Sequence, residues 1–238
     1  MFVLFRYSDG GSMEHKPDYV TKIGLVKHFM KVFEGHTIYI VADNVSDESY
    51  EMLKAYVPDE SYIQRTNYRN CPGSFMHGLK WMIETLKDED QLYMSEDDYI
   101  YVHDAPRLLH EGLNIKYADY VSGYDHPDKY INKSDGGPNP FVSDGGEPTK
   151  VIIGASNHWK YTNSCCMTFA ATIKTLKEDY DTIAMFNSSS RSADFEMFLA
   201  LWKKNRKLIS PLPGISTHCE KQLLSPFVDW KQQYESLQ

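Results

Sequence analysis

The sequence predicts an α/β protein whose Rossmann-like mixed sheet carries helices on both faces. Apolar runs of strand length, such as Phe2–Phe5 and Thr37–Ala42, alternate about four times with amphipathic segments over the first hundred residues. This alternation is typical of βαβ units around a parallel sheet. Charged residues follow three of the runs, and ligands of such sheets bind beyond the carboxyl ends of the strands. We therefore expect a binding crevice there.

The first half contains four predicted strands and three predicted helices. The strands are Phe2–Phe5, Thr37–Ala42, Ser61–Gln64 and Leu92–Met94. The helices begin near Pro17, Ser46 and Pro72, because proline suits a first helical position and serine suits an N-cap. The third helix has the regular apolar stripe of a well-buried face. The inner face predicted for the first helix is Val20, Ile23, Met30 and Phe33.

The second half is less regular. Its predicted strands are Tyr117–Gly123, Val151–Ile153 and Cys165–Phe169, and its helices lie around Ala171–Lys177 and after Ser192, a plausible N-cap. The intervening loop, residues 125–150, is rich in Gly, Pro, Asp and Asn, and loops of this length are usually functional or mobile. We expect a single domain of 238 residues.

Composition and charge exclude several classes of protein. The formal net charge is -8, and no Lys/Arg cluster is longer than the one at residues 203–207, which ends a predicted helix, so nucleic acid is not an expected partner. The apolar run at Phe2–Phe5 is too short for a signal peptide, and no run of about 18 apolar residues follows. Four cysteines form no C-x-x-C pair. We expect a soluble, cytoplasmic protein with reduced thiols and no transmembrane segment.

Three consecutive carboxylates, Glu96, Asp97 and Asp98, follow the predicted strand Leu92–Met94. Because like charges repel, a bound cation would favour such a triplet, and Mg²⁺ or Mn²⁺ typically binds one or two carboxylates together with phosphates. If the strand continued, Glu96 and Asp98 would point to the same side and could face one ion. A solvated acidic turn explains the triplet equally well.

Three further segments contain candidate site residues. Asp194 could be a general base at the mouth of a cleft, or it could only complement a helix dipole. His218 lies in a loop with Gly and Pro and could bind a metal, although a lone histidine is more often a surface or core residue. Trp159 and Asn163 could bind an acceptor sugar by stacking and hydrogen bonding, although packing explains Trp159 slightly better.

In this order, the segments resemble glycosyltransferases of the A-type fold (GT-A), especially the inverting, family 2-like enzymes and their small bacterial and viral members. The resemblance covers Phe2 to about Trp230. It implies one glycosyltransferase domain, 1–238, with a nucleotide-binding half at 1–104 and an acceptor-binding half at 105–238. The residues it implies for the nucleotide-sugar donor are Arg6, Tyr7, Asp43, Asn44, Ser74, Glu96 and Asp97.

The same resemblance implies a metal site and a base. Asp98 would bind Mn²⁺ or Mg²⁺, with Glu96 in place of the family's first Asp and His218 as a further ligand. Asp194 would be the catalytic base, with Glu196 as the alternative, because the Glu that precedes the family's base is missing here.

The activity that the resemblance implies is metal-dependent transfer of a sugar from a nucleotide-diphosphate sugar to a hydroxyl of a glycan or other acceptor, with inversion. UDP is weakly favoured over GDP as the donor nucleotide, because Asp43 suits a base N–H donor.

Two other functions stay open. A sugar nucleotidyltransferase has a similar sheet and acid–metal chemistry, but it normally has a basic, Gly-rich phosphate loop after the first strand. Here residues 8–12 contain two glycines, and the nearest lysine is Lys16. A non-catalytic module that binds nucleotide sugars is the second alternative, and the missing Glu before Asp194 favours it.

Overall fold

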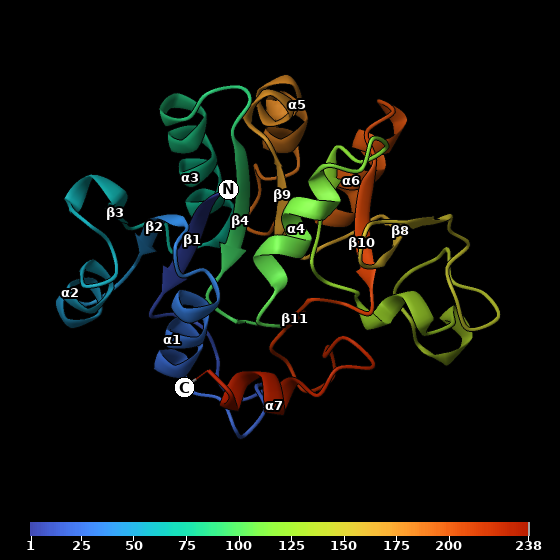
Figure 1. The fold of residues 1–238 in the computed structure, drawn as a ribbon, viewed down its shortest axis with the longest axis horizontal. Helices are drawn as coiled ribbons and strands as arrows, with labels where there is room; N and C mark the ends of the chain where they lie inside the picture. The colour runs from blue at the N-terminus through green and yellow to red at the C-terminus, as the bar shows by residue number, and fades with distance from the viewer. Residues whose placement is uncertain (238) are drawn as a thin grey trace.

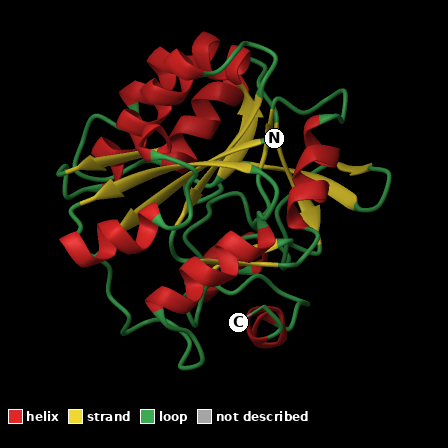
Figure 2. Cartoon of the chain, turned by 60° about the vertical axis from the view of Figure 1, so that its left-hand side comes forward, coloured by secondary structure: helices red, strands yellow, loops and turns green. Residues whose placement is uncertain are grey.

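The computed structural model describes residues 1–237 and confirms the predicted class. Within these residues, a nine-stranded sheet has the order β3-β2-β1-β4-β9-β6-β10-β8-β7, and β5 pairs with β11 in a second, two-stranded sheet. Figures 1 and 2 show helices on both sides of the large sheet. No helix of residues 1–237 combines the length and the apolar character needed to cross a bilayer.

The elements follow one another along the chain as strands and helices of ordinary length. The strands are β1 (Phe2–Ser8), β2 (Thr37–Asp43), β3 (Ile63–Thr66), β4 (Gln91–Glu96), β5 (Tyr99–Tyr101), β6 (Tyr120–Val121), β7 (Val151–Ile153), β8 (His158–Thr162), β9 (Phe169–Thr172), β10 (Leu208–Leu212) and β11 (Ser216–His218). The helices are α1 (Lys22–Val32), α2 (Asp47–Lys54), α3 (Cys71–Thr85), α4 (Ala105–Leu113), α5 (Ile173–Met185), α6 (Asp194–Lys203) and α7 (Trp230–Glu235).

Strand direction changes once the chain leaves its first half. β3, β2, β1 and β4 are parallel, and their register brings Ser8 beside Asp43 and Arg6 beside Glu96. β9 then pairs antiparallel with both β4 and β6. The sheet therefore runs without a break through both predicted halves. The polar residues of three neighbouring strand ends lie along one edge of it.

The alternation of side chains in β1 divides the core between the two faces of the sheet. Val3 and Phe5 belong to the cluster that α1 and α4 cover, whereas Leu4 belongs to the cluster covered by α3, α5 and α6. Phe5 stacks on Phe29 of α1 with ring centroids 4.2 Å apart. Burying one such side chain contributes roughly 1.5–3 kcal/mol, so both faces hold their helices firmly.

Two predicted elements begin later than expected. The first helix starts at Lys22 rather than Pro17, because the Thr21 side chain caps it by accepting from the Gly24 amide. This shift leaves Ile23 56% exposed instead of on the inner face. The strand predicted at Cys165–Phe169 begins only at Phe169, because Cys166 and Met167 have φ angles of 48° and 57°, which no strand residue adopts.

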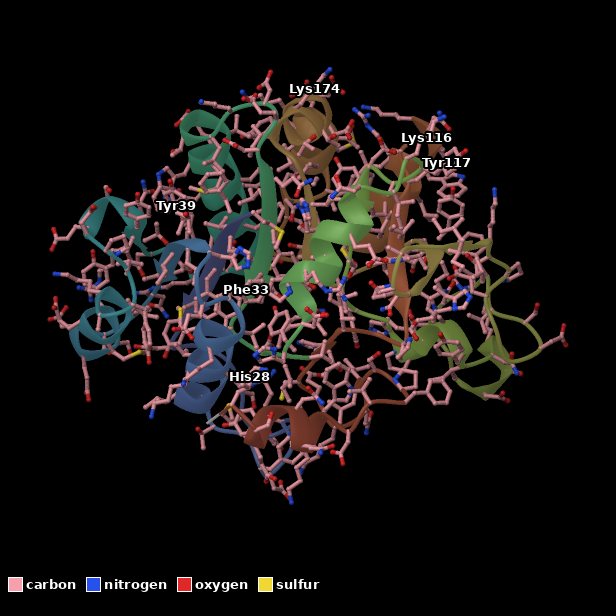
Figure 3. The ribbon with its side chains drawn as sticks, in the orientation of Figure 1. His28, Phe33, Tyr39, Lys116, Tyr117 and Lys174 are labelled. Atoms are coloured by element: carbon pink, nitrogen blue, oxygen red, sulfur yellow. The ribbon has the colours of Figure 1, made fainter. Side chains whose placement is uncertain are left out.

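His28 on α1 provides a test of this packing (labelled in Figure 3). Its ring is fully buried, and Nε2 accepts a hydrogen bond from the Tyr101 amide at 3.0 Å. Burial lowers the pKa of His28 to about 4, from an ordinary value of 6.5. As the pH falls below 6.5, His28 becomes protonated in the unfolded chain, whereas in the folded chain it stays neutral until about pH 4. The folded state therefore loses stability between these two pH values.

We therefore expect urea unfolding to show a larger loss of stability for the natural chain than for His28→Gln between pH 7 and pH 5. The expected difference is about 2 kcal/mol, since one pKa unit corresponds to about 1.36 kcal/mol. Gln is chosen because its amide oxygen can still accept from Tyr101. Parallel pH profiles of the two proteins would show that His28 is not buried as described.

Candidate active site

The carboxyl ends of β1, β2 and β4 meet in a cleft of about 480 Å³. This volume suits a small-molecule ligand. The nucleotide-binding residues predicted from the sequence all line the cleft, together with the predicted metal ligand Asp98. They are Arg6, Tyr7, Asp43, Asn44, Ser74, Glu96 and Asp97. The fold thus brings together side chains that are as far as 92 positions apart in the sequence.

Glu96, the last residue of β4, pairs with Arg6 of the neighbouring strand. Arg6 Nη2 lies 2.5 Å from Glu96 Oε1, and Nη1 donates to the Cys71 carbonyl and to Ser74 Oγ. Burial alone would lower the pKa of Arg6, but Cys71 and Glu96 raise it above its ordinary value. The buried guanidinium is therefore permanently charged, and it links β1 to β4 and to the first turn of α3.

The other two carboxylates of the triplet turn away from Glu96. β4 ends at Glu96, and Asp97 and Asp98 form the turn that leads into β5. Asp97 Oδ2 lies 2.6 Å from Lys22 Nζ and accepts from the Ser8 amide at 2.8 Å. The strand alternation that would point Glu96 and Asp98 to one side therefore does not hold.

Asp98 pairs with two other basic groups. Its Oδ2 lies 2.7 Å from Lys16 Nζ and 2.9 Å from His218 Nε2. Burial would raise the pKa of Asp98, but His218 and Lys16 lower it well below its ordinary value. Burial would likewise lower the pKa of His218, and Asp98 raises it. Each acid of the triplet thus has its own basic partner.

This arrangement is not a preformed site for the divalent cation that the resemblance implies. In the part of the chain that the structure describes, no group of three or more His, Cys, Asp or Glu side chains is placed to hold a metal ion. Asp98 and His218 are close enough to share an ion, but the ammonium of Lys16 lies against the same oxygen of Asp98. Binding of Mn²⁺ or Mg²⁺ by Glu96, Asp98 and His218 stays a prediction.

Asp43, at the end of β2, is held by its own chain. Its carboxylate accepts hydrogen bonds from Thr66 Oγ1 and from the amides of Tyr68 and Arg69, at 2.6–2.9 Å. The side chain is only 4% exposed. Asp43 therefore shapes the loop that leads to α3, and this loop brings Arg69 into the cleft, with a left-handed φ of 59°. Because the Asp43 carboxylate accepts hydrogen bonds from its own chain, this geometry does not support the weak preference for UDP that was based on Asp43.

Three basic residues of the cleft are missing from the predicted site. Lys16, Lys22 and Arg69 line it beside Arg6. The position of Lys16 just after the Gly-rich segment could have indicated a phosphate-binding role. Its pairing with Asp98, however, spans 82 positions and leaves no local pattern in the sequence. The N-terminus of α3, capped by Asn70, also opens on the cleft. It adds the partial positive charge of a helix start.

The predicted base, Asp194, opens α6 beside this cleft but is not among its lining residues. Its Oδ2 accepts from the amides of Cys165 and Cys166, both at 2.8 Å, and so fixes the turn before β9. The predicted cap is also displaced by one residue: Ala193, not Ser192, is the N-cap, and it makes no side-chain hydrogen bond. Ser192 Oγ instead lies 3.5 Å from Cys71 Sγ at the cleft.

The alternative base, Glu196, is exposed and lies outside the residues that line the cleft. Its place in the first turn of α6 agrees with a purely structural role, in which an acidic side chain complements the helix dipole.

The two predicted acceptor-binding residues lie elsewhere. Trp159 is fully buried in the core, with its indole N–H donating to Glu111 at 3.3 Å, so its ring offers no face to an acceptor. Asn163 lines a separate, largely apolar cavity of about 720 Å³. There its amide donates to Glu147 and accepts from the buried Lys129, which anchors the long loop. Packing and loop anchoring therefore explain both residues.

Comparison with known proteins gives matches among solved structures only. No family model matches the sequence, and no curated protein matches it. The apo form of the glycosyltransferase GlyE from Streptococcus pneumoniae is 11% identical with a TM-score of 0.44, over 88% of this chain and 44% of that one. TarS from S. aureus is 12% identical with a TM-score of 0.48, over 88% and 57%.

A third similar structure is the 2-C-methyl-D-erythritol 4-phosphate cytidylyltransferase of Francisella tularensis, at 11% identity and a TM-score of 0.47, over 99% of this chain and 96% of that one. The chain spans about half the length of the first two structures. Identities and scores this low assign no activity to the chain.

Proposed function

We propose that the chain is a glycosyltransferase that moves a sugar from a nucleotide-diphosphate sugar to an acceptor hydroxyl, with inversion. The observation that carries this proposal is the cleft at the ends of β1, β2 and β4. Polar residues from all three strand ends line it, as do four basic side chains, Arg6, Lys16, Lys22 and Arg69. Basic side chains and a helix N-terminus are the groups that bind phosphates in proteins.

The reaction is a single displacement. The acceptor oxygen forms a bond to the anomeric carbon while the bond from that carbon to the diphosphate breaks. The diphosphate leaves with the electron pair, and the basic side chains of the cleft stabilise its charge as it develops. Attack from the face opposite the leaving group inverts the anomeric centre.

Asp194 is the proposed base. Both of its backbone hydrogen bonds among the described residues go to Oδ2. This arrangement orients the carboxylate and lets Oδ1 take the acceptor proton. Ser192, two positions earlier, lies near Cys71, whose Sγ is 3.4 Å from Glu96 Oε1, so α6 begins close to the acidic triplet. A base within one hydrogen bond of the acceptor hydroxyl typically contributes 10²- to 10⁴-fold in rate.

One observation favours a second function, sugar nucleotidyl transfer. The Gly10–Gly11 segment that follows β1 lines the cleft together with Lys16 and Lys22. A glycine-rich loop with nearby lysines is the phosphate-binding arrangement that such enzymes normally have, and the sequence alone does not place these lysines there. Here the substrate would be a nucleoside triphosphate and a sugar phosphate, and the leaving group would be pyrophosphate.

A thermal-shift panel of nucleotides and nucleotide sugars tests whether the cleft is a nucleotide site. We expect a nucleoside diphosphate, or its sugar ester, to raise the melting temperature. At about 100 times its dissociation constant, the ligand adds roughly 2.7 kcal/mol of stability. UDP and GDP compounds are compared because the donor nucleotide is open. If no nucleotide or nucleotide sugar stabilises the chain at millimolar concentration, the proposed function fails.

A further inference from the structure

We propose that Lys16 and Lys22 bind the diphosphate of the donor in the place of a divalent cation, so that donor binding in this cleft needs no metal. The inference rests on the proposed nucleotide site and specifies which groups of that site balance the negative charge of the diphosphate. Two acids of the triplet, Asp97 and Asp98, each pair with one of these lysines.

Each lysine holds one aspartate of the turn after β4. Lys16 Nζ lies 2.7 Å from Asp98 Oδ2, and Lys22 Nζ lies 2.6 Å from Asp97 Oδ2. The side chain of Lys16 is only 8% exposed and that of Lys22 is 22% exposed. One ammonium group thus lies against Asp98, a predicted metal ligand, and the other lies against the neighbouring Asp97. They supply positive charge at that point.

The charge of the whole cleft depends on these lysines. Five acidic side chains among the described residues line it, Asp43, Glu96, Asp97, Asp98 and Glu220. Without Lys16 and Lys22, the permanently charged cations that line the cleft among the described residues would be Arg6 and Arg69, with His15 as a further basic group. A diphosphate would then be repelled by a strongly negative site, and each added cation lowers the electrostatic free-energy cost of binding it. With both lysines present the cleft is close to neutral.

Both lysines keep donors for a ligand. An ammonium group has three N–H donors. Within the described residues, Lys16 Nζ and Lys22 Nζ each donate one hydrogen bond, to Asp98 and to Asp97. The aspartates therefore fix the position of the ammonium groups without using all of their donors. Held in this way, the lysines need little rearrangement to bind phosphate oxygens.

The backbone around Lys22 also allows a phosphate to approach. A Cβ built on Gly11 would lie 3.7 Å from Lys22 Nζ, and Gly11 has a φ of 135°. The absence of a side chain at Gly11 leaves the space beside the ammonium group open on that side. Gly10, Gly11 and Lys22 all line the cleft, as do Asp97 and Asp98.

A different role would also explain the geometry, since the lysines could act only as counterions of buried carboxylates. The two roles differ in what they predict. A counterion acts on the nucleotide only through the charge that it balances, so removing the aspartate charge as well, as in Lys22→Gln/Asp97→Asn, should restore nucleotide affinity. A phosphate ligand is lost in both variants, so affinity should stay weak in the double variant. Affinity measured with every metal ion chelated separates them.

The test is isothermal titration of the full chain with UDP and, separately, with GDP, in EDTA and then in Mn²⁺. We expect at least one nucleotide to bind in EDTA, and Lys22→Gln and Lys16→Gln each to weaken that binding about 10- to 100-fold, the effect of a lost hydrogen bond to a charged group. Lys22→Arg should retain affinity within a few-fold. Lys174→Gln is the charge-matched control, since Lys174 opens α5 at the opposite end of the sheet (Figure 3).

The variant Asp98→Asn distinguishes most clearly between binding of the diphosphate by Lys16 and binding of the diphosphate through a metal ion on Asp98. If Lys16 binds the phosphate, removing the charge of its partner should leave affinity in EDTA unchanged or raise it. If Asp98 binds a metal, nucleotide binding should require Mn²⁺ and be lost in this variant, which overturns the inference while the proposed function stands. Unchanged affinity of a folded Lys22→Gln in EDTA also overturns the inference. Absence of nucleotide binding in both buffers overturns the inference and the proposed function together.

Circular dichroism of each variant accompanies the titrations. Lys16 is nearly buried, and if Lys16→Gln does not fold, Lys22→Gln and Lys22→Arg decide the question, because Lys22 is partly exposed and its loss is better tolerated.

Discussion

Asp194→Asn is expected to lower the turnover of sugar transfer about 100- to 10,000-fold and to leave nucleotide affinity unchanged. The acceptor proton leaves during attack, and an amide cannot take it. The fold should survive, because the side-chain oxygen of Asn can still accept from the amides of Cys165 and Cys166. Replacing charged by neutral hydrogen bonds there should cost about 1 kcal/mol. Turnover, nucleotide affinity and melting temperature are measured on the same preparation.

Glu196→Gln is the matched control for this prediction. Glu196 lies in the same first turn of α6 and is exposed. We expect this variant to turn over at the natural rate. If instead Asp194→Asn stays active and only melts earlier, Asp194 serves only to fix the turn before β9. A large rate loss in Glu196→Gln would move the base to that residue.

Arg6→Met is expected to destabilise the folded chain by about 3 kcal/mol. The substitution leaves the Glu96 carboxylate without its cation and removes the donor to the Cys71 carbonyl and Ser74. Losing one partner of a buried pair typically costs 3–5 kcal/mol, and the lower end applies because Glu96 is 22% exposed. Urea unfolding at neutral pH measures the change.

The double variant Arg6→Met/Glu96→Gln is the control, since it removes both charges. It should recover part of the loss, because no unpaired charge remains in the cleft. A single Arg6→Met variant that loses less than about 1 kcal/mol would show that the pair contributes no more than an exposed salt bridge.

The sequence predicts well those features that depend on neighbouring residues. The strands β1 and β2, the helix α3 and the Ser46 cap of α2 follow from local apolar periodicity and capping chemistry, and each lies within a few residues of its predicted position. The place of the cleft also follows, because parallel strands align their carboxyl ends.

Features that depend on residues far apart in the sequence cannot be predicted from local sequence patterns. β5 and β11 pair across more than 100 positions, and neither strand is among the predicted elements. Trp159 looks equally suited to a core or to a sugar site, and only the packed fold buries it. The left-handed Cys166 and Met167 stop a run that reads as a strand.

The acidic triplet shows the same limit. Its residues and its place at the end of β4 are clear in the sequence, but the charge state of the cleft is set by partners elsewhere in the chain. Lys16 comes from the segment between β1 and α1, Lys22 is the first residue of α1, and His218 comes from β11, 120 positions after Asp98. A pattern that covers only Glu96–Asp98 therefore favours a metal, and it gives no sign that Asp97 and Asp98 each lie against a lysine.

The most direct test of the central claim is ³¹P NMR of the products formed from candidate substrates. The full chain is incubated with a panel of UDP-sugars and GDP-sugars and a mixture of hydroxyl acceptors, and in parallel with nucleoside triphosphates and sugar phosphates, each in EDTA and in Mn²⁺. The account predicts release of a nucleoside diphosphate from one of the nucleotide sugars, and loss of this signal in Asp194→Asn. Pyrophosphate release from a nucleoside triphosphate, with no nucleoside diphosphate from any sugar donor, would contradict it and identify nucleotidyl transfer instead.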